Sequence, residues 1–310
     1  MPRPLRYMPR PNSTFEITTR TVHARFLLKP SRGLNELVLG VIGRALSLYP
    51  VRLHLFVVAS NHMHMILTAP DIRRVSEFMR YVNSNIAREA GRLYRWREKF
   101  WGRRYSSIVI LDEQKMLERA RYLLSHGCKE GLVVRPGDWP GVNCVGALTR
   151  GKKLRGVWYD RSLQYEAERT GRKEPERNFA TSYDVELAPL PCLEHLDEAQ
   201  RRVFYRGMVR EIELETRRMQ RGGRRVAGRK VILSQRPHDR PEKPARRPRP
   251  LCHCSDPEMR ARYRDDYRWF VSLYAEASRR YRAGQLGVEF PPNCFPPPRP
   301  FFAGPDPPPQ

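Results

Sequence analysis

The sequence predicts an α+β fold in which helices pack on one face of an antiparallel sheet. Three observations in residues 1–150 point to this class. Apolar residues alternate with polar ones in several short segments, which is the period of a strand. In other segments they recur every three or four residues, which is the period of an amphipathic helix. Two of the strand-like segments are separated by only two polar residues, as in an antiparallel hairpin.

The first strand and the first helix are predicted from the segment that ends at Pro50. Residues 15–19 alternate between apolar and polar side chains and indicate a strand. A helix then begins at Ser31 or Asn35, both of which are residue types that cap helices, and it ends before Pro50.

A hairpin follows directly. Residues 51–59 and 62–69 are predicted to be strands, and Ser60 and Asn61 form the turn between them. In this register Ala59 faces the first residue of the second strand. The hairpin therefore gives two antiparallel strands that are neighbours in the sheet.

A helix, a strand and a further helix complete this part of the chain. The long helix begins at Asp71, residues 103–111 form the strand, and Asp112 caps a helix over residues 113–126. The order is therefore strand, helix, strand, strand, helix, strand, helix. This order resembles the split βαβ, ferredoxin-like arrangement.

The remaining residues, 151–310, are predicted to be a C-terminal extension of a domain formed by residues 1–150. Within it, residues 217–249 contain 13 Lys or Arg and two acidic residues, which is typical of a basic linker without fixed structure. Residues 256–283 show helical periodicity. Residues 291–310 contain ten prolines and are expected to be extended.

The charge of the chain indicates the class of its partner. The 310 residues include 58 Lys or Arg and 33 Asp or Glu, a formal net charge of +25. Such an excess attracts polyanions, and nucleic acid is the first to consider. No segment approaches the roughly 20 apolar residues of a membrane span, and the N-terminal segment lacks the apolar stretch of a signal peptide. These features favour a cytoplasmic, nucleic-acid-binding protein.

The six cysteines are too few for a disulfide scaffold. Their one cluster, Cys252-His253-Cys254, lacks the two spaced pairs that usually make a zinc site. Reduced thiols are therefore the favoured interpretation, with a zinc site as the alternative.

Two histidines of the second hairpin strand are the first candidates for chemistry. His62 and His64 alternate on a strand, so both side chains project from the same face and could bind one metal ion together. Two hydrogen-bonded or exposed histidines without a metal are the alternative. His54 is excluded, because the predicted hairpin register places it on the other face.

A tyrosine on the helix over residues 113–126 is the second candidate. Tyr122 and His126 are four residues apart and therefore neighbours on the polar face of this helix. A tyrosine oxygen can attack phosphorus, and a metal ion can neutralise the charge of a phosphodiester. The alternative is an amphipathic surface tyrosine.

Three segments of the chain resemble the single-tyrosine HUH transposases, in particular the REP-associated tyrosine transposases and the IS200-like transposases. The segments are SNHMHMIL (60–67), KFWGRRYSS (99–107) and ARYLLSHGCKEGLVVRPGDWP (120–140). They occur in the order and spacing of the family, within residues 1–150.

The resemblance implies a role for each matching residue. His62 and His64 are the implied metal ligands, and Tyr122 is the implied nucleophile. His126 stands at the third-ligand position, where the family commonly has Asn or Gln. Ser60 replaces the usual Pro. The implied cofactor is Mg²⁺ or Mn²⁺, and histidine at the third position puts a strict dependence on Mg²⁺ in question.

The family further implies a reaction, its partners and a location. The reaction is cleavage and rejoining of hairpin-forming single-stranded DNA through a 5′-phosphotyrosine, carried out by a homodimer in the bacterial cytoplasm, in association with the nucleoid. Two alternatives remain open. One is a non-catalytic or domesticated nucleic-acid-binding protein, and the other is a metallohydrolase that uses water in place of tyrosine.

A group of seven cations is the predicted DNA-contacting surface. They lie at the end of the long helix and in the segment that follows, interleaved with five aromatic residues that could stack on unpaired bases. The alternative is a solvated basic face above core aromatics. The cations are Arg88, Arg92, Arg95, Arg97, Lys99, Arg103 and Arg104.

Overall fold

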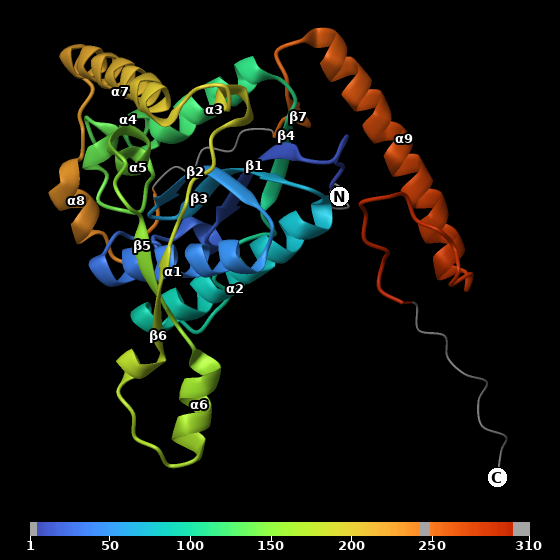
Figure 1. The fold of residues 1–310 in the computed structure, drawn as a ribbon, viewed down its shortest axis with the longest axis horizontal. Coiled ribbons are helices and arrows are strands. Elements are labelled where there is room, and N and C mark those ends of the chain that lie inside the picture. Colours follow the sequence, from blue (N-terminus) through green and yellow to red (C-terminus); the bar gives the residue numbers. More distant parts are fainter. Residues whose placement is uncertain (1–4, 242–248, 300–310) are drawn as a thin grey trace.

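A five-stranded sheet forms the centre of the protein in the computed structural model, which describes residues 5–241 and 249–299. The strand order is β2-β3-β1-β4-β7, and every neighbouring pair is antiparallel except β4 and β7. The predicted α+β class with an antiparallel sheet is thereby confirmed (Figure 1). The strands are β1 (Ser13–Arg20), β2 (Arg52–Ala59), β3 (His62–Ala69), β4 (Ser106–Ile110) and β7 (Cys252–His253).

Helices cover both faces of this sheet. The sequence predicts helices on one face only, and that layer consists of α1 (Arg32–Leu48) and α2 (Ile72–Tyr94). On the other face lie α3 (Glu113–Leu124) and the short α4 (His126–Lys129) (Figure 1). All eight residues of β3 are therefore buried.

The helix starts follow the predicted caps. The side chains of Ser31, Asp71 and Asp112 each accept a hydrogen bond from a backbone N–H in the first turn of α1, α2 and α3. This satisfies a donor that would otherwise lack a partner. Of the two candidates for the first cap, Ser31 holds the position, and Asn35 lies inside α1.

The β2–β3 hairpin has the predicted register at its turn end. Ala59 pairs with His62, and Val57 pairs with His64. A bulge near Leu53 and Leu55 shifts the register further along β2.

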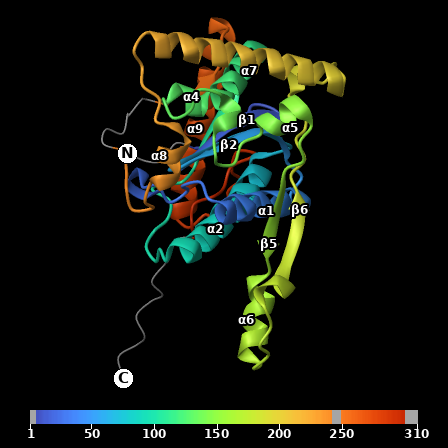
Figure 2. The same cartoon turned by 90° about the vertical axis from the view of Figure 1, so that its left-hand side faces the viewer.

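The chain beyond residue 150 begins with an arm that projects from the body. After α5 (Val145–Arg150), strands β5 (Arg155–Tyr159) and β6 (Ala180–Asp184) pair as a two-stranded sheet, with α6 (Arg161–Arg169) between them in sequence (Figures 1 and 2).

The base of this arm packs closely on α1. A Cβ atom at Gly40 would lie 2.1 Å from the carbonyl oxygen of Val157, and one at Gly156 would lie 2.1 Å from the backbone nitrogen of Gly40. Only glycine fits at either position, so the backbones of α1 and β5 are in direct contact.

The C-terminal part is more ordered than the sequence suggests. The predicted linker over 217–249 is wrong for its first half: residues 217–221 are the end of α7 (Glu198–Arg221), and α8 (Gly228–Ser234) follows. The side chain of Ile232 is fully buried, and this contact helps α8 to form despite its charge. Residues 242–248 of that segment lie outside the described residues.

The last helix, α9 (Pro257–Arg282), occupies the range predicted as 256–283. Of the predicted Pro-rich tail, residues 291–299 form no helix or strand, and 300–310 lie outside the described residues. The described residues also form four short 3₁₀ helices: Val22–Ala24, Pro136–Asp138, Glu176–Phe179 and Pro191–Leu193.

One apolar core runs across the predicted boundary at residue 150. Tyr205 and Ile212 of α7, Cys252 of β7 and Tyr263 of α9 belong to the same buried cluster as the sheet. The extension therefore packs into the domain. All six cysteines are free thiols. Within the described ranges, no helix has the length and apolar character that crossing a bilayer requires.

Candidate metal centre and nucleophile

Three buried histidines meet between β3 and the α3–α4 junction. Each of His62, His64 and His126 offers one ring nitrogen, and these nitrogens all lie within 4.8 Å of one another. The ring centroids are 5.1 Å apart for His62 and His64, 4.6 Å for His62 and His126, and 5.2 Å for His64 and His126. The alternation along β3 and the start of α4 thus bring together the three predicted ligands.

Hydrogen bonds orient the two strand histidines. Nδ1 of His62 lies 2.5 Å from Oδ1 of Asn61, and Nδ1 of His64 lies 3.2 Å from Oε1 of Glu16. Oγ1 of Thr18 also lies 3.0 Å from Nδ1 of His64. When Nδ1 of each ring donates its proton to the Asn61 or Glu16 oxygen, Nε2 keeps a lone pair. Metal-binding histidines usually have this arrangement.

The third histidine has buried nitrogens without a partner. Among the described residues, neither Nδ1 nor Nε2 of His126 finds a hydrogen-bond partner. Burial lowers the pKa of His126 to about 3, and the nearby charges of His64 and Lys129 add to the effect. A neutral imidazole with unsatisfied nitrogens is costly when buried. A bound cation would satisfy one of them, so the three histidines fit a divalent metal ion.

Tyr122 lies at the edge of this cluster. Its ring centroid is 5.6 Å from that of His64 and 6.0 Å from that of His126. Two cations contact the ring: Cζ of Arg119 lies 4.0 Å and Nζ of Lys129 lies 4.4 Å from its centroid. Burial raises the pKa of the Tyr122 hydroxyl, and the charge of Arg119 opposes that rise.

Glu16 on β1 connects the cluster to two other parts of the chain. Its carboxylate accepts two hydrogen bonds from Arg119 of α3, and Nε2 of His253 on β7 lies 2.7 Å from Oε2. Burial alone would raise the pKa of Glu16. Contacts with His253, His64 and Arg119 outweigh burial and hold the pKa of Glu16 well below its ordinary value.

His54 lies outside the cluster, as expected, but for a different reason. The bulge in β2 directs its ring to Thr68, at the far end of β3 from His62, where Nε2 lies 2.8 Å from Oγ1. Tyr105 contacts Ser76 of α2, to which its hydroxyl donates a hydrogen bond. It is buried beneath Arg6, whose Cζ lies 4.0 Å from the ring centroid.

All seven cations predicted to contact DNA are exposed. Of the five aromatic residues among them, Phe100 and Tyr105 are buried and cannot stack on bases, whereas Tyr94, Trp96 and Trp101 are half-buried. Trp96 and Trp101 each donate an indole hydrogen bond to a backbone carbonyl. Packing therefore accounts for Phe100 and Tyr105, and base stacking by the half-buried aromatic residues stays a prediction.

The Cys252-His253-Cys254 cluster forms no metal group. In the part of the chain that the structure describes, His62, His64 and His126 form the one group of three or more residues able to hold an ion. His253 instead lies beside Glu16, and both cysteines are buried.

Sequence reasoning missed Glu16, Arg119 and Lys129. A signal existed for the first, because Glu16 is the single acidic residue of β1 and shares the strand face of His64 through the pair Thr18–His64. A signal for Arg119 also existed, since it lies three residues before Tyr122 on the polar face of α3. Nothing local indicated that the two would meet.

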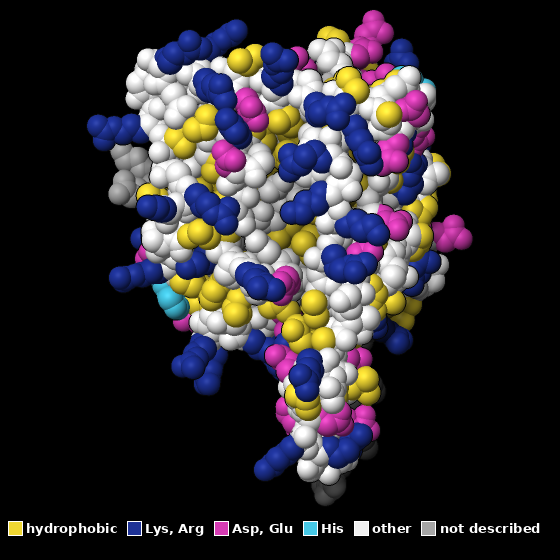
Figure 3. All heavy atoms as spheres, turned by 60° about the vertical axis from the view of Figure 1, so that its left-hand side comes forward, with side chains coloured by type: hydrophobic (Ala, Val, Ile, Leu, Met, Phe, Trp, Pro, Cys, Tyr) yellow, Lys and Arg dark blue, Asp and Glu magenta, His cyan; other side chains and the backbone are white. Residues whose placement is uncertain are grey.

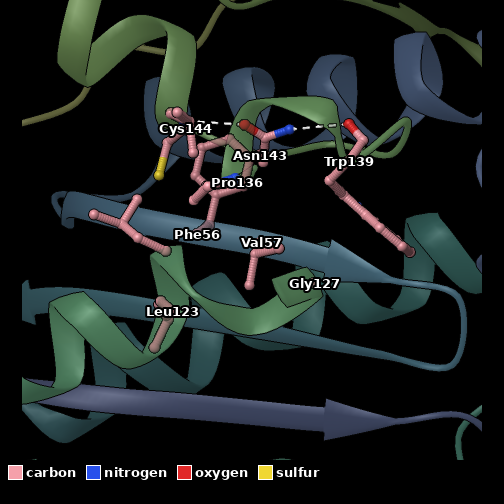
Figure 4. A pocket seen from close by; sticks show the side chains of 10 residues that line it. Phe56, Val57, Leu123, Gly127, Pro136, Trp139, Asn143 and Cys144 are labelled. Atoms are coloured by element: carbon pink, nitrogen blue, oxygen red, sulfur yellow. Dashed lines mark hydrogen bonds between the residues drawn. The ribbon is translucent and has the colours of Figure 1, made fainter. Parts of the chain in front are cut away.

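Beneath α4 the structure is closely packed. The space between α4 and β2 is a cavity of about 10 Å³, which is about the room that one water molecule needs. Trp139 donates its indole hydrogen bond to the carbonyl of Val58 beside it. The α3–α4 junction thus packs on a core that leaves room for about one water molecule. The labelled lining residues are Phe56, Val57, Leu123, Gly127, Pro136, Trp139, Asn143 and Cys144 (Figure 4).

Comparison with known families gives one match. The family model described as "Transposase IS200 like" matches residues 18–124. This range includes His62, His64 and Tyr122 and ends two residues before His126. No curated protein matched the chain.

Two solved structures are similar to parts of the chain. One is the REP-associated tyrosine transposase bound to a REP hairpin, which is 20% identical over 49% of this chain and 87% of that chain, with a TM-score of 0.41. The other is a protein assigned as a transposase from Deinococcus radiodurans R1. It is 15% identical over 39% of this chain and 95% of that chain, with a TM-score of 0.28.

Proposed function

Because residues 18–124 match the family model described as "Transposase IS200 like", we propose that this chain cleaves and rejoins single-stranded DNA with Tyr122 as its nucleophile. The observation that carries the proposal is the position of Tyr122 beside three buried histidines that fit a metal ion. A nucleophile and a cation site at one place are what attack on a phosphodiester requires.

The proposed reaction is a transesterification. Oη of Tyr122 attacks the scissile phosphorus, its proton is lost, and the bond from phosphorus to the 3′ oxygen breaks. The products are a 5′-phosphotyrosine and a free 3′-OH. A 3′-OH of a second strand can then attack the phosphotyrosine and release the tyrosine. One ester replaces another at each step, so rejoining needs no nucleotide cofactor.

Three histidines would hold the metal ion. His62, His64 and His126 supply the ligands, and a bound Mg²⁺ or Mn²⁺ would neutralise charge on the phosphate oxygens. The Nδ1–H groups of His62 and His64 are already occupied by Asn61 and Glu16, which leaves Nε2 of each ring to face the ion.

Arg119 and Lys129 support the nucleophile. Both cations lie over the Tyr122 ring and favour the phenolate over the neutral phenol. Because Glu16 fixes the guanidinium of Arg119 with two hydrogen bonds, this charge stays at the ring.

The proposed partner is hairpin-forming single-stranded DNA, bound by a homodimer. The exposed cations at the end of α2 and before β4 support a nucleic-acid surface. The segment that carries these cations leads into β4, whose first residue, Ser106, pairs with Thr18 of β1. Thr18 in turn pairs with His64, so the segment ends near the start of β3.

Covalent trapping tests the proposal. The full-length protein is incubated with a labelled single-stranded hairpin and Mn²⁺, and the products are separated on a denaturing gel. We expect a DNA–protein adduct whose linked peptide contains Tyr122. The Tyr122→Phe variant should give no adduct and still bind the hairpin, because it loses one oxygen and keeps the ring. Loss of one hydroxyl hydrogen bond lowers the free energy of unfolding by about 1 kcal/mol, so this half-buried side chain should keep the fold.

Tyr105→Phe is the matched control, and it should form the adduct at the parent rate. An adduct that persists in Tyr122→Phe, or maps to another residue, contradicts the assignment. DNA cleavage without an adduct would indicate a hydrolase that uses water. Binding without cleavage by the parent protein would indicate a DNA-binding protein that has lost turnover.

A further inference from the structure

A second basic segment borders the candidate site from the C-terminal part of the chain. Residues 217–240, here called the basic strap, contain nine Lys or Arg and a single acidic residue, Asp239. All nine cations are exposed. The strap comprises the end of α7, the whole of α8 and the residues that follow, and it lies outside the family match over 18–124.

The first half of the strap is fixed to the loop that follows His126. The backbone N–H groups of Ala227 and Gly228 donate hydrogen bonds of 2.9 Å to the carbonyls of Gly131 and Leu132. The side chain of Arg224 donates to the carbonyl of Lys129, whose own Nζ lies over the Tyr122 ring. Through Lys129, this half of the strap therefore borders the candidate nucleophile, Tyr122.

The second half crosses the turn that leads into β3. Ser60 stands two residues before His62, and its Oγ donates a 2.6 Å hydrogen bond to Oε1 of Gln235 in the strap. The carbonyl of Asp239 accepts a 2.9 Å hydrogen bond from the N–H of Phe26. The ring of His238 lies 5.4 Å from that of Trp96, next to the end of α2.

This path joins two basic surfaces. It starts at Lys129 beside Tyr122 and ends at Trp96, among the cations that follow α2. Figure 3 turns the side on which α8 lies toward the viewer and shows Lys and Arg side chains spread over it. Exposed cations thus extend from the nucleophile to the end of α2.

The strap cations are not neutralised within the protein. None of the nine forms an ion pair with a carboxylate of the described residues. On α9, Arg262, Arg268 and Arg279 each pair with an acidic residue of their own helix. Arg264, Arg280 and Arg282 of α9 form no ion pair within the described residues either, which makes them suitable controls for charge. Unpaired like charges that are held close together repel one another, and a bound polyanion removes that cost.

We infer that the basic strap is a DNA-binding surface that holds the single-stranded segment next to the scissile phosphate. The inference rests on the proposed function, because it assigns the position of the strand relative to Tyr122. Backbone hydrogen bonds fix the strap in place, so its cations need little ordering when a strand binds. The contacts are to phosphates and do not depend on base sequence.

Salt dependence of binding tests the inference. The full-length protein is titrated with a labelled hairpin that carries a single-stranded flank, at several salt concentrations between about 50 and 200 mM. The test variant combines Arg225→Gln, Arg229→Gln and Lys230→Gln. The matched control combines Arg264→Gln, Arg280→Gln and Arg282→Gln, three exposed cations of α9. Melting curves verify that both variants fold.

We expect the strap variant to lose about 2 units of the log–log salt slope, since each phosphate contact of a single strand contributes about 0.7. The α9 control should keep the parent slope. A second variant with Arg225→Lys and Arg229→Lys keeps the positive charge and should also keep the parent slope. This result would show that the strap variant loses slope because it loses charge. A strap variant with the parent slope overturns this inference alone. A parent protein that binds no DNA overturns the proposed function as well.

Discussion

Arg119 donates two hydrogen bonds to the carboxylate of Glu16, at 2.7 and 2.8 Å, across the space between α3 and β1. The same guanidinium lies over the ring of Tyr122. Glu16 also contacts His64, so one buried carboxylate orients both a candidate ligand and the cation beside the candidate nucleophile. A mutation at Glu16 therefore tests whether metal binding and catalysis both depend on the Glu16 carboxylate.

Glu16→Gln should weaken both stability and catalysis. The change keeps the shape of the side chain and removes the charge that compensates Arg119. Breaking a buried ion pair of this kind lowers the free energy of unfolding by about 3 kcal/mol. Loss of a contact to a metal ligand lowers metal affinity by about 10- to 100-fold. Urea unfolding and the adduct assay measure the two effects.

Glu36→Gln is the control for that prediction. Glu36 pairs with Arg32 on the surface of α1, where the loss should stay below about 1 kcal/mol. If both variants lose the same free energy of unfolding, the buried Glu16–Arg119 pair contributes no more to stability than a surface pair.

Metal ions should stabilise the parent protein against heat. The buried nitrogens of His126 lack partners, and an ion that binds only the folded state adds about 2.7 kcal/mol at a concentration 100 times its Kd. We therefore expect Tm to rise with Mn²⁺ and to return after chelation. His126→Ala should abolish most of this shift, whereas His195→Ala, at an exposed site, should keep it. An equal shift in both variants would place the ion elsewhere.

Stability should fall between pH 7 and pH 5, in part because of His54. Burial lowers the pKa of His54 to about 4 from its ordinary 6.5. Between these values the unfolded chain binds a proton that the folded chain excludes. The stability contribution is therefore complete above pH 6.5 and is lost as the pH falls toward 4. Linkage gives a loss of about 2 kcal/mol between pH 7 and pH 5.

His54→Gln removes this titration and keeps a polar group near Thr68. Urea unfolding at the two pH values should show a smaller loss for the variant than for the parent. The same loss in both proteins would mean that other groups account for the pH dependence.

A chain that ends at Arg150 should not fold to a stable domain. It lacks Tyr205 and Ile212 of α7, which are part of the core, and Glu211 and Glu215, which pair with Arg121 of α3. We expect non-cooperative unfolding and binding of a dye that detects exposed apolar surface. Removal of residues 291–310 is the control and should leave unfolding cooperative. A stable, active fragment of residues 1–150 would restore the boundary predicted from the sequence.

Local patterns were sufficient to predict the sheet, its hairpin and the histidine pair. Alternation fixes which residues of β3 share a face, and the Ser60-Asn61 turn fixes the register of His62 and His64. Helical spacing likewise places Tyr122 close to His126. Each of these relations spans only a few residues, so the period of one element determines it.

Relations between distant segments were not predictable in this way. Glu16 and Arg119 are 103 residues apart, and no period connects a strand with a helix that follows three other strands. The strand β7 has only two residues and pairs with β4 after a long excursion of the chain. For α8, composition suggested disorder, whereas the burial of Ile232 and hydrogen bonds to Gly131 and Leu132 stabilise a helix.

The late position of β7 has a consequence for the newly made chain. His253 is synthesised 127 residues after His126. At about 5 to 20 residues per second, this interval lasts about 6 to 25 s. During it the three histidines and Tyr122 already exist, but Glu16 has only Arg119 and His64 as partners, and the outer edge of β4 is open. An open strand edge pairs readily with other chains. The ribosome-bound intermediate is therefore the stage at which this protein is most prone to aggregate.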